Sequence, residues 1–231
     1  MGYYFLSNYY YVIIVLPMVI LSLIASARVN STFNKYSKVF SSRQMTGAQA
    51  AFEILRYYGI TNVKIERVSG KLTDHYDPKT NVIRLSDSVY DSTSVGAIGV
   101  ACHEAGHAAQ YATSYAPIKL RNFIFPVASL GSNLGIPIAI LGIFLSFQPL
   151  VIAGVVFFTF AVFFQLVTLP VEFNASRRAL QVISETSILS DVEKDGARKV
   201  LSAAAMTYVA ALAVSIANLL RLLLLTNRRR K

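Results

Sequence analysis

Residues 122–171 read NFIFPVASLGSNLGIPIAILGIFLSFQPLVIAGVVFFTFAVFFQLVTLPV and contain no lysine, arginine, aspartate or glutamate. The tripeptide FQP at 147–149 interrupts this run near its middle, and a polar residue beside a proline is typical of a turn. A helix needs about 20 apolar residues to cross a hydrocarbon core of about 30 Å. The stretch therefore predicts two spans, residues 123–147 and 150–169, and with them an integral membrane protein.

Two further apolar runs, residues 4–27 and 203–226, are each long enough to cross a bilayer. The first has no basic residue before it and begins with clustered tyrosines, which favours an uncleaved anchor over a signal peptide. The second contains Arg221 and ends in NRRRK, so it either crosses the membrane or lies along its interface. We therefore expect a mainly α protein with three to four transmembrane helices.

The chain carries 22 lysines and arginines against 12 acidic residues, a net charge of +10. These basic residues flank the apolar runs, which indicates contact with anionic lipid headgroups and not with nucleic acid. More of them lie beside the polar region than before the first span, which places that region on the cytoplasmic side of a membrane, expected to be a bacterial cell membrane. The single cysteine, Cys102, excludes an intramolecular disulfide and is expected to be a small buried thiol.

Composition divides the chain into five segments. A transmembrane anchor precedes an α+β catalytic region, which is followed by a two-span hairpin, a pair of helices, and an apolar helix with a basic tail. The boundaries are 1–27, 28–121, 122–171, 172–202 and 203–231.

The polar region should hold two amphipathic helices and a small sheet. One helix begins after a capping Thr46, ends at Gly59, and is expected to bury Ala48, Ala51, Phe52 and Leu55. NVKIERV alternates as a strand does, and GKLTDHYDPKTNVIRLS predicts two short strands around the turn DPKTN. A second helix, capped by Ser92 or Ser94, runs through VGAIGVACHEAGHAAQYA.

That second helix contains HEAGH, residues 103–107. Residues four apart on a helix project from the same face one turn apart, so His103 and His107 can bind one ion. Glu104 can reach the open position of a zinc ion and act as a general base. A chance pair of histidines is the alternative. Against this alternative, two of the three histidines in the chain lie in this motif, and the neighbouring small residues leave room for close packing around a site. We therefore predict one Zn²⁺ per chain.

A hydrolytic zinc site needs a third protein ligand. The residues alone leave two candidates, His75 in LTDHYDP and Glu172 at the end of the uncharged run. A carboxylate at the foot of a membrane span is costly without a partner, which favours Glu172. Its alternative role is a headgroup-level ion pair with Arg177 or Arg178.

With HEAGH, PVEFNASRRA and GKLTDHYDP, nearly the whole chain resembles the YugP-like family of "putative neutral membrane zinc metallopeptidases". More distantly it is similar to the CAAX-prenyl and stress-response membrane zinc proteases. The resemblance implies a zincin-like (gluzincin-type) catalytic region with the HExxH histidines, His103 and His107, as zinc ligands. It also implies that Glu104 is the catalytic base and Glu172 the third ligand.

In the distant relatives an aspartate four residues after the glutamate supports a zinc-binding histidine, and Ser176 holds that place here. A serine can still form a hydrogen bond, although without charge, and Asn174 is a second candidate for this support. The relatives also bind substrate backbone along a strand next to the zinc helix. The corresponding candidates here, for substrate or oxyanion contact, are Asp74, His75, Tyr76 and Arg177.

These features predict a zinc endopeptidase that cleaves peptide bonds of membrane or membrane-proximal proteins. Glu104 would take a proton from metal-activated water and pass it to the leaving amine. The main alternative is a zinc-stabilised scaffold that binds membrane-protein partners without catalysis. Glu104 favours the enzyme, because a purely structural site tends to be closed by a fourth protein ligand. A transporter is disfavoured, because the predicted hairpin has no ionisable group to coordinate cargo.

Overall fold

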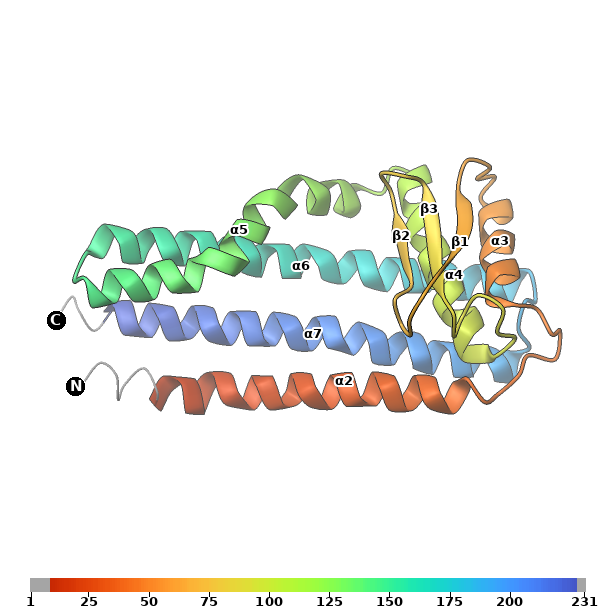
Figure 1. Ribbon diagram of the computed structural model, residues 1–231, viewed down its shortest axis with the longest axis horizontal. Helices are drawn as coiled ribbons and strands as arrows, with labels where there is room; N and C mark the ends of the chain where they lie inside the picture. Colours follow the sequence, from red (N-terminus) through yellow and green to blue (C-terminus); the bar gives the residue numbers. More distant parts are fainter. Residues whose placement is uncertain (1–8, 228–231) are drawn as a thin grey trace. The chain divides into compact units, whose positions relative to one another are not determined.

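The computed structural model describes residues 9–227 (Figure 1). The chain divides into two compact units. Of the described residues, the helical unit comprises 9–26, 119–169 and 206–227, and the sheet unit comprises Ala27–Ile118 and Pro170–Ala205. The predicted start of the first span at residue 4 and the charges of the NRRRK tail lie outside the described residues.

Four helices in the described part of the chain are long and apolar enough to cross a membrane. They are α2 (Leu16–Tyr36, preceded by the π-helical turn Tyr11–Val15), α5 (Ala116–Phe144), α6 (Gln148–Glu185) and α7 (Asp191–Asn227). The prediction of a mainly helical protein is confirmed, and these four helices are candidates for the three to four predicted spans. Because α6 and α7 continue without a break, the expected segment boundaries at 171/172 and 202/203 fall inside helices.

Small residues bring α5 and α6 together in the helical unit. A Cβ added to Gly154 would lie 2.4 Å from the Ala139 nitrogen, and one added to Gly131 would lie 2.0 Å from the Phe157 oxygen. Membrane helices approach closely where side chains are this small. Large apolar side chains such as Phe123 and Phe144 are exposed, as a surface that faces lipid requires.

The sheet unit contains three short strands in the order β1-β3-β2. β1 (Lys64–Val68) runs parallel to β3 (Val82–Ser86), whereas β2 (His75–Asp77) pairs with β3 antiparallel. The two strands around the DPKTN turn were predicted, and β2 is an edge strand of the sheet. α3 (Gly47–Tyr57) packs along α4 (Val95–Ala112), and the sheet contacts both helices.

Both helix caps follow from local hydrogen bonding. Thr46 and Gln49 form a reciprocal capping box at the start of α3. Of the two serines proposed for α4, Ser94 is the cap, since its side chain accepts from the Ala97 N–H. The expectation that Phe52 is buried is wrong, because the face of α3 that is buried carries Ala50, Ala51, Ile54 and Leu55, and Phe52 is 58% exposed.

Candidate metal centre

Both histidines of HEAGH lie on one face of α4, as their spacing predicts. The His103 and His107 rings are 4.7 Å apart between centroids and nearly perpendicular. Each ring is largely buried, with side-chain exposures of 16% and 13%. α4 therefore presents two imidazole nitrogens toward one point inside the sheet unit.

Glu172 reaches the same point from α6. Its Oε2 lies 3.3 Å from Nε2 of His103 and 3.6 Å from Nε2 of His107. Tetrahedral zinc with bonds of about 2.0–2.2 Å separates its ligand atoms by about 3.3–3.6 Å. Among the described residues, Oε2 is buried and accepts no hydrogen bond, which would be costly without a cation. The three side chains therefore fit a zinc ion.

The alternative role of Glu172, a headgroup-level ion pair with arginine, is not what the structure shows. Arg178 instead donates through Nε to Asn174 Oδ1, 2.8 Å away, and Arg177 is exposed. His75, the other candidate third ligand, is also exposed, and its Nδ1 lies 2.8 Å from the Thr73 carbonyl. Neither the two arginines nor His75 belongs to the cluster of His103, His107 and Glu172.

A glycine sets the close approach of α4 and α6 at the cluster. A Cβ added to Gly106 would lie 2.5 Å from the Ala175 carbonyl oxygen. Gly106 immediately precedes His107, and Ala175 is about one helical turn after Glu172. Gly106 therefore limits how closely Glu172 can approach the two histidines.

Polar groups contact the Nδ1 atoms, on the other side of each imidazole ring. Ser176 Oγ lies 3.0 Å from Nδ1 of His103. Gln110 Oε1 lies 3.0 Å from Nδ1 of His107. Ser176 contacts a histidine, as the sequence analysis suggested for this residue. Gln110 was not among the residues that the sequence analysis singled out. The sequence offered only its spacing, three residues after His107 on the same helix, because its complete burial is a property of the tertiary structure.

Glu104 is not one of the three clustered side chains, and it is almost fully buried. Its Oε2 accepts a hydrogen bond of 3.0 Å from the backbone N–H of Tyr76 in β2. The edge strand therefore orients the carboxylate that was predicted to act as general base.

The remaining strand candidates have different surroundings. Asp74 accepts hydrogen bonds from the Ser86 backbone and hydroxyl, and burial raises the pKa of its carboxyl. The Tyr76 hydroxyl donates to Asn81. Cys102 is fully buried and outside the cluster, and burial raises the pKa of its thiol. Of the strand candidates, Tyr76 is the one that donates a hydrogen bond to Glu104, through its backbone N–H.

Charge near the ligands favours cation binding. Burial lowers the pKa of His107, but the carboxylates of Glu172 and Glu104 outweigh this and raise it overall. A positive charge is therefore favourable between these side chains, whether it is a proton or a metal ion.

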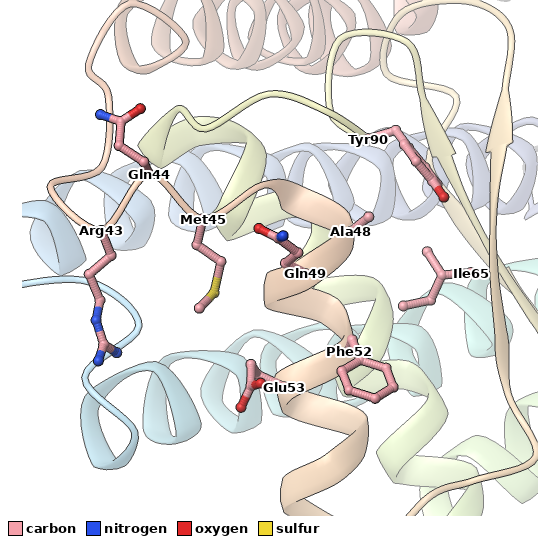
Figure 2. A pocket seen from close by; sticks show the side chains of 9 residues that line it. All are labelled: Arg43, Gln44, Met45, Ala48, Gln49, Phe52, Glu53, Ile65 and Tyr90. Atoms are coloured by element: carbon pink, nitrogen blue, oxygen red, sulfur yellow. The ribbon is translucent and has the colours of Figure 1, made fainter.

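One surface cavity, of about 680 Å³, lies elsewhere in the sheet unit (Figure 2). It is bordered by the exposed ring of Phe52 and by Glu53 on α3, with Ile65 and Tyr90 across from them. No ligand of the candidate metal centre lines it.

Comparison with known proteins confirms the resemblance. The family described as "Putative neutral zinc metallopeptidase" matches residues 11–227. The protein named "Putative membrane protease YugP" of Bacillus subtilis (strain 168) is 48% identical over 205 residues, which cover 89% of this chain and 91% of that protein. No solved structure matches this chain.

Proposed function

Since the chain belongs to the family of "putative neutral zinc metallopeptidases", we propose that it is a membrane-integral zinc endopeptidase. The observation that carries this proposal is the convergence of His103, His107 and Glu172 beside a carboxylate, Glu104, that is not one of the three. Three protein ligands leave one position of a tetrahedral zinc ion open, as in catalytic sites, whereas structural sites are closed by a fourth.

The reaction is hydrolysis of a peptide bond, in which water adds across the bond to give a carboxylate and an amine. When bound by the three ligands, zinc supplies polarisation of a carbonyl and a lowered pKa of water. Glu104 accepts a proton from the attacking water and donates it to the departing amine nitrogen. The Tyr76 N–H orients the Glu104 carboxylate for these two transfers.

A peptide can approach this site along β2. One edge of β2 pairs with β3, and on its other edge the Tyr76 N–H points to Glu104. A substrate in extended conformation that adds to that edge would place its backbone next to the general base. Specificity would then come from the side chains around β2, where His75 is exposed. Arg177 is also exposed.

We further propose that the substrates are membrane or membrane-proximal proteins in a bacterial cell membrane. The four apolar helices hold the chain at the bilayer. The surplus of basic residues beside the polar region favours a cytoplasmic site and contact with anionic headgroups.

The decisive experiment compares the wild type with Glu104→Gln and Glu172→Ala, using purified protein and a library of membrane-protein substrates. Glu104→Gln should retain one zinc per chain and lose hydrolysis, because it removes the proton acceptor and no ligand. Glu172→Ala should lose both the bound zinc and the hydrolytic activity after dialysis against a mild chelator. Normal turnover by Glu104→Gln would refute the proposed role.

A zinc-stabilised scaffold remains the alternative function. It predicts that Glu104→Gln leaves both zinc content and the cellular phenotype unchanged. The same variant therefore separates the two functions, because only an enzyme needs the carboxylate.

A further inference from the structure

A polar network extends away from the metal centre behind His107. Gln110, fully buried, accepts from His107 through Oε1, and its Nε2 donates to two acceptors on α6. These are the Val171 carbonyl at 2.7 Å and Asn174 Oδ1 at 3.0 Å. Asn174 Oδ1 also accepts from Arg178 Nε at 2.8 Å.

From this geometry we infer that Gln110 is a positioning residue, which, with Asn174 and Arg178, fixes the tautomer of His107 and aligns it with Glu172. The inference rests on the proposed function only in requiring that the cluster bind zinc. None of the three residues is a ligand or touches the reacting atoms.

The direction of every hydrogen bond follows from the far end of the network. Arginine can only donate, so Asn174 must present its oxygen to Arg178 and to Gln110. Gln110 must then present its NH₂ group to Asn174, which turns its oxygen toward His107. An amide oxygen can only accept, so His107 Nδ1 must carry the proton.

This forces the lone pair of His107 onto Nε2, the atom that faces Glu172 Oε2. The Val171 carbonyl enforces the same orientation independently, because it too can only accept. Val171 is also the residue before Glu172. The bond from Gln110 thus ties one ligand helix to the backbone beside the third ligand.

Arg178 is itself held in place by aromatic rings. Its guanidinium carbon lies 5.7 Å from the Tyr58 ring centroid and 5.8 Å from that of Tyr115, within the range of cation–π attraction. This contact fixes the guanidinium where its Nε reaches Asn174.

His103 differs from His107 in this respect. Its partner, Ser176, has a hydroxyl that can donate or accept, so that contact does not dictate a tautomer. The network therefore acts on one of the two histidine ligands.

The test measures zinc affinity by competition with a chelator for Gln110→Met, Asn174→Leu and Asn174→Asp. The first two remove the network's hydrogen bonds at similar volume, whereas aspartate still accepts from both Gln110 and Arg178. Gln110→Met should weaken zinc binding by roughly tenfold to a hundredfold. Asn174→Leu should weaken it too, and Asn174→Asp should keep wild-type affinity. Gln181→Met, on the exposed surface of α6, is the matched control.

The visible spectrum of the cobalt-substituted protein gives a second readout, which should change in Gln110→Met and Asn174→Leu and not in Asn174→Asp. Should Gln110→Met fail to fold without metal, the partly exposed Arg178 carries the test through Arg178→Met, which should weaken zinc binding. Wild-type affinity in Gln110→Met or Arg178→Met, or an equal loss in both Asn174 variants, would overturn the inference. Because affinity is measured without substrate, failure here is distinguishable from absence of peptidase activity.

Discussion

Replacing Gly106 by alanine should separate the third ligand from the two histidines. The new Cβ would lie 2.5 Å from the Ala175 carbonyl oxygen, whereas ordinary contacts begin at 3.4 Å and tight ones at 3.0 Å. The helices must therefore move apart locally by about 0.5–0.9 Å, the difference between these distances. Metal sites tolerate deviations of about 0.2 Å in ligand distance.

The expected loss has two parts. Overpacking a buried contact costs about 1–3 kcal/mol, and the better helix propensity of alanine offsets about 1 kcal/mol of this. Misplacement of Glu172 should add at least a tenfold loss of zinc affinity, which corresponds to about 1.4 kcal/mol.

Chelator competition measures the zinc affinity, and thermal unfolding of the metal-free protein measures the packing cost. Gly99→Ala is the matched control on α4, because its Cβ would lie 3.3 Å from a methyl group, that of Ala197, with no backbone atom closer. It should bind zinc normally and unfold at nearly the wild-type temperature. Wild-type zinc affinity in Gly106→Ala would refute the reasoning that this glycine sets the ligand geometry.

Three further predictions concern other parts of the sheet unit. Ser176→Asp should tighten zinc binding, because it places a carboxylate at Nδ1 of His103; loss of zinc would contradict this. Cys102 should resist alkylation at pH 8 until the protein unfolds, because its thiol is buried and burial raises the pKa of that thiol. Cysteines introduced at residues 40 and 80 can therefore report the topology without background labelling of Cys102. Labelling of these two cysteines from outside intact cells would exclude a cytoplasmic site. Hydrogen bonds from Thr80 and the Lys79 N–H lower the pKa of Asp77 to about 2, below the unfolded value of about 3.9, so its contribution to stability is present above pH 4 and is lost as pH falls toward 2. The difference in thermal stability between the wild type and Asp77→Asn should shrink over that range.

Features that depend on near neighbours in the chain could be read from the sequence. The apolar runs predict the four long helices, since the length needed to cross a bilayer is a local property. The capping box at Thr46 and the strands around DPKTN depend on residues within a few positions of each other. The shared face of His103 and His107 follows from helical geometry alone.

Features that depend on distant segments needed the tertiary structure. Glu172 lies 65 positions or more after the histidines, and sequence favoured it without excluding His75. Nothing local indicates which face of α3 meets α4, so Phe52 was expected in the core and is exposed. Gln110 was overlooked for the same reason. Its amide acquires a direction only when packing brings the Val171 carbonyl and Asn174 against it, because the polarity of a buried hydrogen bond is set by partners far away in the chain.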